Sequence, residues 1–214
     1  MRGMIYKDLC LFVKGVDKWA LAVMVGLLVL FVVQGGEYAG MLYSFALDMM
    51  VGLLHLTALE KEEKTAWGSY QQTMPVGVGK VIVGKYATVL LTVLVSVTGA
   101  VACNLAAFAV YQTFLPEVLK FSVLLAVAIP LAWTALSLPF FYWFGNQVAQ
   151  YTSMPLAFLL FFSLRDFEDG KWAVADLTFL SENLTSVLLV GALSLAGLLL
   201  ASLAVSAAGY CRRR

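Results

Sequence analysis

The sequence predicts an all-α integral membrane protein with six transmembrane helices, and three observations lead to this fold class. Of the 214 residues, 62% are hydrophobic and 13% are charged, whereas soluble domains are about half apolar and about a quarter charged. The apolar residues form six stretches close to the ~20 residues that a helical span needs. The basic residues gather in alternate connections between these stretches. Residues 1–214 are therefore expected to form a single transmembrane domain.

The first 16 residues predict an amphipathic helix that lies at the inner membrane interface. The lysines Lys7, Lys14 and Lys18 lie off its apolar face. That face has helical spacing and consists of Ile5, Leu9, Phe12, Val13 and Val16. The alternative is a short cytosolic extension of the first span. Charged residues interrupt the segment before the first long apolar run, which excludes a cleavable signal sequence.

The apolar stretches and the charges between them predict the spans and their orientation. The spans are 18–34, 38–57, 84–111, 119–143, 147–164 and 185–209. Eleven of the fourteen basic residues lie in the N-terminal segment, in the 58–83 connection with its boundary residue Lys85, or at the C-terminus. Because basic residues favour the cytoplasmic side, both termini and the 58–83 connection are expected in the cytoplasm. The acidic 165–183 connection is expected outside, in a multi-pass plasma membrane protein.

The cytoplasmic 58–83 connection predicts a short amphipathic helix. Glu60 and Lys64 form an i, i+4 ion pair, Glu62 is expected at a solvated rim, and Pro75 limits the helix. Its apolar stripe consists of Trp67, Tyr70 and Met74. Such a helix either docks into a groove of a partner protein or rests on the inner leaflet, and the spacing alone fits both.

The stretch GKVIVGKY at 79–86 has the glycine and lysine spacing of a nucleotide-binding P-loop but lacks its other features. Tyr86 stands where a small hydroxyl residue would bind Mg²⁺. Three of the four intervening residues are β-branched, whereas a phosphate cradle needs inward-turned backbone N–H groups. A polar segment, not a buried strand, precedes the stretch. No cofactor is therefore expected in this chain, and ATP and Mg²⁺ are expected on a partner.

Few polar side chains fall within the predicted spans, and Asp48 is the most informative of them. His55 follows seven residues later on the same helical face. An intramembrane carboxylate is costly and often functional. The two residues therefore predict either a proton relay or an aspartate paired with a neighbouring helix beside an interfacial histidine. Asn104 is expected to hydrogen-bond between helices.

Prolines and small residues mark helices that are expected to bend or to pack closely. Pro130, Pro139 and Pro155 permit kinks. Small residues four positions apart allow close approach of helices, either within the chain or between two copies. These small residues include Gly99, Cys103, Ala107, Ser202 and Ser206.

Several function classes are excluded by composition. A net charge of +1 argues against a nucleic-acid partner. One histidine and three scattered cysteines provide neither a metal site nor a disulfide framework. Glu62 and Glu63 are similar to the paired glutamates of one class of membrane proteases, but they lie outside the predicted spans. The chain is therefore not expected to be an enzyme.

Four motifs resemble the ABC type-2 permeases. They are YKDL at 6–9, EKEEKTAW at 60–67, MPVGVGKVIVGKY at 74–86 and LPFFYWFG at 138–145. The resemblance is strongest to the small six-span permeases that work with separate ATPase subunits, some of which export amphipathic peptides and toxins. It implies a bacterial permease subunit of an ATP-driven exporter for amphipathic or hydrophobic cargo. The alternative is a proton-coupled secondary transporter that uses Asp48.

In that family, the loop helix after the second span is a coupling helix that fits a cleft on the ATPase, and the N-terminal helix abuts the ATPase. The residues that match the coupling region by position are Glu60, Glu63, Trp67, Tyr70, Pro75, Lys80 and Lys85. Residues 77–79 depart from the family, which tends to have a polar or basic residue there, so the basic contact rests on Lys80. The implied partners are a cytosolic ABC ATPase, a second permease copy (identical or a paralogue) and membrane lipid.

Overall fold

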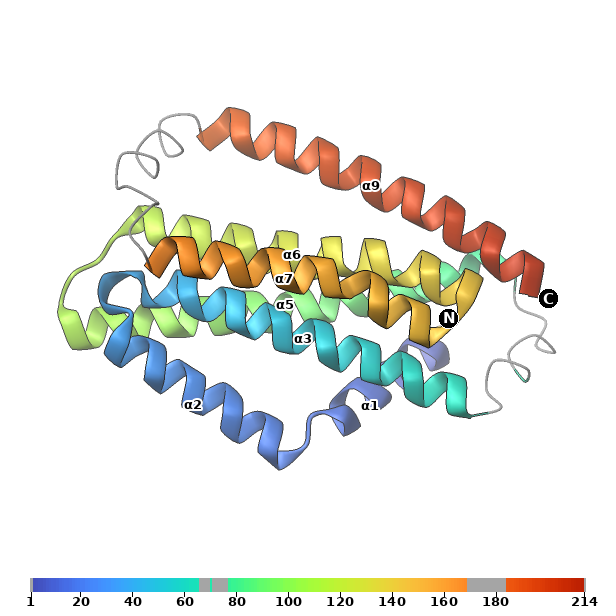
Figure 1. Ribbon diagram of the computed structural model, residues 1–214, viewed down its shortest axis with the longest axis horizontal. Coiled ribbons are helices and arrows are strands. Elements are labelled where there is room, and N and C mark those ends of the chain that lie inside the picture. Colours follow the sequence, from blue (N-terminus) through green and yellow to red (C-terminus); the bar gives the residue numbers. More distant parts are fainter. Residues whose placement is uncertain (1, 66–69, 71–76, 169–183, 214) are drawn as a thin grey trace.

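The computed structural model describes residues 2–65, 70, 77–168 and 184–213, and they form an all-helical fold (Figure 1). Helices account for nearly all of these residues, and no strand occurs among them. The elements are α1 (Arg2–Gly15), α2 (Lys18–Gln34), the 3₁₀ helix η1 (Gly36–Tyr38), α3 (Ala39–Lys64), α5 (Val78–Tyr111), α6 (Pro116–Phe144), α7 (Asn146–Glu168) and α9 (Leu184–Arg213).

A helix overlaps each of the six predicted spans. Among the described residues, four helices are long and apolar enough to cross a membrane on their own. These four are α3, α5, α6 and α9. The 17-residue α2 passes the same test only together with α1, from which it is bent by 73°. Helix α7 begins with a polar turn that contains Asn146, Gln147 and Gln150. The prediction of an all-α membrane protein is confirmed, whereas six spans remain a prediction.

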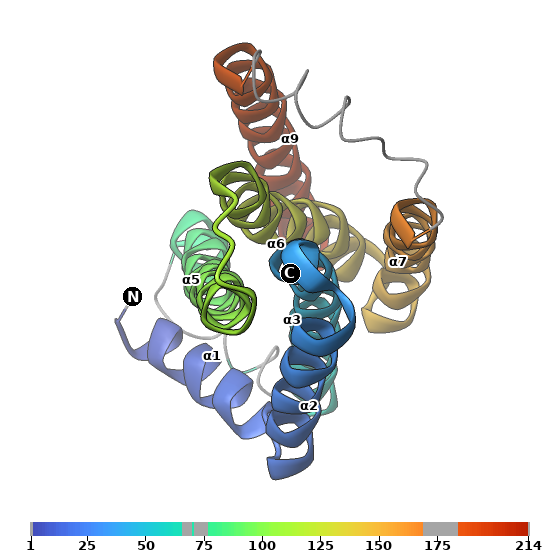
Figure 2. The same cartoon turned by 90° about the vertical axis from the view of Figure 1, so that its left-hand side faces the viewer.

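Helix α6 lies in the middle of the bundle and contacts α3, α5, α7 and α9 (Figure 2). Its residues Trp133 and Leu138 are almost completely buried. Gly52 of α3 makes room for the indole of Trp133, because a Cβ atom at this glycine would lie 2.7 Å from the ring. Pro130 and Pro139 both lie inside α6.

Helix α9 is attached to the bundle by hydrogen bonds near its C-terminal half. Tyr86 of α5 and Ser202 of α9 are hydrogen-bonded through their hydroxyl groups at 2.6 Å, and Ser202 donates to the carbonyl of Ala135 in α6. Trp143 Nε1 donates to the carbonyl of Val205 at 2.9 Å. The small-residue stripe of α9 thus faces helices of the same chain at Ser202 and Ser206.

Helices α3 and α5 approach closely at Gly40. The Asn104 side chain of α5 packs there, and a Cβ atom on Gly40 would lie 2.1 Å from its Nδ2. This amide donates to the carbonyl of Ala100 in its own helix at 2.8 Å. Among the described residues, the Asn104 side chain is seen to hydrogen-bond to its own helix and to contact α3 by packing. Its second N–H and its amide oxygen are not used by that bond, so a hydrogen bond to another helix stays a prediction.

Both helices that flank the 58–83 connection extend beyond the predicted span ends. Helix α3 continues to Lys64 and α5 begins at Val78. Residues 79–85, with the spacing of a P-loop, are α-helical. The end of α3, the start of α5, the turn between α6 and α7 and the end of α9 lie at one end of the bundle, close to α1 (Figure 1).

Candidate functional site

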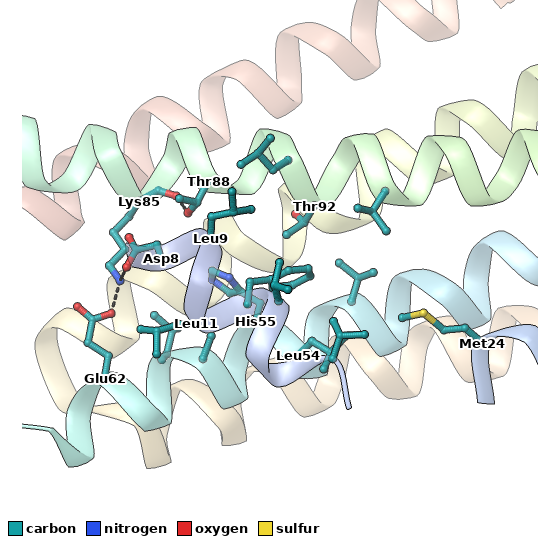
Figure 3. A pocket seen from close by; sticks show the side chains of 18 of the residues that line it. Asp8, Leu9, Leu11, Met24, Leu54, His55, Glu62, Lys85, Thr88 and Thr92 are labelled. Atoms are coloured by element: carbon teal, nitrogen blue, oxygen red, sulfur yellow. Dashed lines mark hydrogen bonds and ion pairs between the residues drawn. The ribbon is translucent and has the colours of Figure 1, made fainter. Parts of the chain in front are cut away.

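Four charged side chains from three helices meet at this end of the bundle, and we call them the four-charge cluster. The members are Lys7 and Asp8 of α1, Glu62 of α3 and Lys85 of α5. Lys7 Nζ lies 2.9 Å from Asp8 Oδ1 and 3.2 Å from Glu62 Oε1. Lys85 Nζ lies 3.1 Å from Asp8 Oδ1 and donates a hydrogen bond to Glu62 Oε2 (Figure 3). The cluster therefore links the amphipathic helix α1 to both α3 and α5.

Burial makes these ion pairs energetically important. Glu62 and Lys85 each expose only 6% of their surface. Desolvating a charge costs several kcal/mol, and good geometry with an opposite charge offsets that cost. Two cations face two carboxylates here, so the cluster is electrically balanced. Removal of one member would leave an uncompensated buried charge and loosen the contact between α1, α3 and α5.

Glu63, the neighbour of Glu62, forms a second link at the same end of the bundle. Its Oε2 accepts a hydrogen bond from the backbone N–H of Asn146 at 2.9 Å. Asn146 is the first residue of α7 and follows Gly145, whose φ of 93° turns the chain between α6 and α7. The first N–H groups of a helix lack partners within the helix and attract negative charge. Glu63 thus ties the end of α3 to the start of α7.

We expect Glu63→Ala to lower the free energy of unfolding by about 0.5–1 kcal/mol, because a carboxylate at a helix N-terminus contributes an interaction of this size. Thermal unfolding of the detergent-purified protein measures the change. Lys61→Ala is the matched control, since Lys61 is an exposed residue of the same helix turn. Equal melting temperatures for Glu63→Ala and the control would show that the contact with α7 contributes nothing.

The predicted coupling residues that the structure describes do not form one constellation. Glu60 pairs with Lys64 at 2.5 Å on the outside of α3, as expected. Lys80 is exposed in the first turn of α5, whereas Lys85 lies inside the four-charge cluster. Tyr70 is helical and 57% exposed. The remaining two, Trp67 and Pro75, lie outside the residues that the structure describes.

The expectation that Glu62 lies at a solvated rim is wrong. Helix α3 continues past the predicted span end, and this brings Glu62 against α1 and α5. Sequence reasoning also missed the role of Asp8. The available signal was the pair Lys7–Asp8 in an otherwise apolar helix, but the helix that it faces could not be identified without the fold.

Asp48 lies deep in the bundle and is completely buried. Its carboxylate lies near the hydroxyl of Ser96 in α5. Among the described residues, no hydrogen-bond partner of ordinary geometry reaches either the Asp48 oxygens or the Ser96 hydroxyl. Among the described residues Asp48 makes no ion pair, so the alternative of an aspartate paired with a neighbouring helix rests on the nearby Ser96 hydroxyl of α5 and stays a prediction. His55 lies two helical turns away, beside the four-charge cluster (Figure 3).

The described part of the chain holds no group of three or more His, Cys, Asp or Glu side chains that could bind a metal ion. The four-charge cluster has two carboxylates, but two ammonium groups already neutralise them. The arrangement links α1, α3 and α5 through paired charges. It offers no nucleophile–base pair.

Comparison with known proteins identifies the family. The profile of a family described as "ABC-2 family transporter protein" matches residues 3–210. Searches of the curated proteins and of the solved structures found no match. The family match extends from α1 through the four-charge cluster to the last turns of α9, and it agrees with an all-helical chain that carries membrane-spanning helices. The chain therefore belongs to the ABC-2 family of transporter proteins and is a multi-pass membrane permease.

Proposed function

We propose that the chain is the membrane-spanning permease subunit of an ATP-driven exporter, which works with a separate cytosolic ABC ATPase. The observation that carries the proposal is the four-charge cluster. It joins α1 to the last turn of α3 and the second turn of α5, at the helix ends that flank the expected coupling loop. A displacement of that loop by the ATPase would reach α1, α3 and α5 together.

In this proposal the permease has six spans. Four are α3, α5, α6 and α9, and the other two are α2 and α7, whose length and composition alone do not identify them as spans. Both termini and the 58–83 connection lie on the cytoplasmic side. The helix ends gathered near α1 in Figure 1 support this arrangement, because the N-terminal helix, the flanks of the connection and the end of α9 lie together. Two copies, or one copy and a paralogue, would enclose the route for cargo.

The cargo class follows from the scarcity of charge in the membrane helices. The predicted spans contain four charged residues. Asp48 and Lys85 are buried inside the bundle, whereas Lys18 and Lys120 are exposed at the ends of their spans. The exposed surfaces of α2, α5 and α9 carry mainly aliphatic side chains. A route lined by such helices suits amphipathic or hydrophobic molecules, such as peptides or lipids, which are proposed to move outward.

Purification of the full-length chain from its own membranes tests the proposal. We expect a protein with a complete P-loop to co-purify and the complex to hydrolyse ATP, while the chain expressed alone does not. Co-purification must survive high-salt washing, which weakens non-specific ionic contacts. Isolation of the chain without any nucleotide-hydrolysing partner, from membranes in which transport is active, would contradict the proposal.

The proposed orientation is tested by cysteine labelling, because eleven of fourteen basic residues lie in segments assigned to the cytoplasm. In a background with the native cysteines replaced, Asp169→Cys should react with a membrane-impermeant reagent from outside. Ser69→Cys should react only after permeabilisation. The opposite pattern would invert the orientation and remove the basis for placing the coupling loop against a cytosolic ATPase.

A proton-coupled secondary transporter is the second candidate. The buried Asp48, which has no ion-pair partner among the described residues, favours it. Asp48→Asn keeps the shape of the side chain and cannot carry a proton. If the chain is an ABC permease, we expect this variant to retain most of the wild-type transport rate. If the chain is proton-coupled, the response of transport to a pH gradient should be lost. Uptake into vesicles with an imposed pH gradient measures the difference.

A further inference from the structure

An apolar cavity of about 420 Å³ lies between α1, α2, α3 and α5, next to the four-charge cluster (Figure 3). Thirteen of its nineteen lining residues are apolar, so its wall is mainly hydrocarbon. Asp8, Glu62 and Lys85 close one end, and Met24 lies at the other. The cavity therefore has a charged end near the membrane boundary and an apolar end within the bundle.

The polar groups of the wall are already paired, with one exception. The hydroxyls of Thr88 and Thr92 donate to carbonyls of their own helix at 2.6 and 2.7 Å. The three charged residues of the wall belong to the balanced four-charge cluster. His55 Nε2 is buried and has no hydrogen-bond partner among the described residues. A buried polar atom of this kind needs a partner. The Nε2 atom is itself closed off from the cavity, so a rotation of the imidazole toward the cavity would let one suitably placed ligand oxygen satisfy it.

The shape of the cavity limits what can enter it. Along α5 its lining runs from Lys85 to Val95, a helical rise of about 15 Å. This length equals about half of the ~30 Å hydrocarbon core of a bilayer, which is the depth of one leaflet. Spread over that length, the volume leaves a narrow channel that a single extended chain fits.

The residues at the rim of the cavity indicate from which side an occupant enters it. Val13, Leu21, Leu91 and Val95 line the cavity and are also among the exposed large hydrophobic residues. They lie on α1, α2 and α5 and continue the aliphatic surface that these helices turn toward the surrounding membrane. The opening is therefore apolar, and an occupant reaches it from the bilayer.

We propose that this cavity binds one acyl chain of a neutral or zwitterionic lipid from the inner leaflet, with a lipid hydroxyl or ester oxygen on His55 Nε2. The balanced cluster at the mouth provides no net charge that would select an anionic or cationic headgroup. The bound chain fills the space beneath α1 and holds this helix against α3 and α5. The proposal concerns lipid binding alone and holds whatever drives transport.

Native mass spectrometry of the detergent-purified full-length chain tests the proposal with lysophosphatidylcholine. Ala58→Trp fills the middle of the cavity, and Val95→Trp narrows its rim. Each should weaken binding by about tenfold or more. Ala102→Trp, on an exposed face of α5 that does not line the cavity, should bind as the wild type does. Comparable circular dichroism and a single size-exclusion peak establish that each variant is folded.

Two further comparisons test the chemistry of recognition. An alkylphosphocholine of equal chain length lacks the hydroxyl and the ester, so His55→Leu should reduce binding of lysophosphatidylcholine by about three- to tenfold and leave binding of the alkylphosphocholine unchanged. A fatty-acid anion and an alkyltrimethylammonium cation should bind more weakly than the zwitterion.

Wild-type binding of lysophosphatidylcholine in both Ala58→Trp and Val95→Trp would overturn the site. Equal weakening of both phosphocholine probes by His55→Leu would overturn the hydrogen bond, and stronger binding of either ion would overturn the headgroup assignment.

Discussion

Lys85→Met is expected to lower the melting temperature of the protein and to uncouple ATP hydrolysis from transport. The substitution removes the only member of the four-charge cluster that α5 contributes, and it leaves a surplus of buried negative charge on Asp8 and Glu62. Breaking a buried ion pair by removing one partner costs about 3–5 kcal/mol. Thermal unfolding in detergent measures the stability, and cargo-stimulated ATP hydrolysis in reconstituted membranes measures the coupling.

A second variant tests whether the loss of coupling between ATP hydrolysis and transport is only a consequence of lower stability. In Glu62→Gln/Lys85→Met the remaining pair, Lys7 and Asp8, is still balanced at 2.9 Å, so the melting temperature should recover. Coupling should stay lost, because α5 no longer has an ionic link to α1 and α3. Lys80→Met is the control, since Lys80 is an exposed lysine of the same helix. Normal coupling in the double variant would show that the cluster only stabilises the fold.

The second large effect is expected in the 58–83 connection, the proposed coupling loop. Trp67→Ala combined with Tyr70→Ala should weaken association with the ATPase by at least ~2 kcal/mol, or about 30-fold, because aromatic anchors in a desolvated pocket dominate binding energies. The measurement is co-purification of the ATPase with the double variant, together with cargo-stimulated hydrolysis. The membrane part should remain folded, since Tyr70 is largely exposed.

The control for this variant is Lys61→Ala, an exposed charge near the start of the loop, which should change the affinity by only ~0–1 kcal/mol. Glu62 cannot serve as this control, because it is buried in the four-charge cluster. Wild-type co-purification and hydrolysis in the Trp67/Tyr70 double variant would mean that the loop helix rests on the inner leaflet and does not bind the ATPase.

The helices could be predicted from the sequence because hydrophobicity over about 20 residues is a local property. The predicted ranges 84–111 and 119–143 lie inside α5 and α6, and the amphipathic pattern of residues 1–16 corresponds to α1. The residues at which the helices end are harder to predict from the sequence. Helix α3 continues for seven residues beyond the predicted end at residue 57, because charged residues also favour helix and find partners on α1 and α5.

The site could be predicted only in part, because its contacts join residues far apart in the sequence. Lys85 and Glu63 were among the expected coupling residues, but nothing local indicates that Lys85 contacts Asp8 across 77 positions or that Glu63 accepts a hydrogen bond from Asn146. The place of Asp48 in a predicted span indicates an intramembrane carboxylate. Its burial, and its lack of an ion-pair partner among the described residues, depend on how α5 packs against α3, which only the fold determines.

The most direct test of the account is transport of a dye-labelled amphipathic peptide in proteoliposomes that contain the chain and its co-purified ATPase. With ATP present and no proton gradient, we expect the peptide to move away from the face that carries the ATPase. Replacing ATP by a non-hydrolysable analogue should stop the movement. Transport driven by a proton gradient in vesicles that contain the chain but no ATPase would contradict the account.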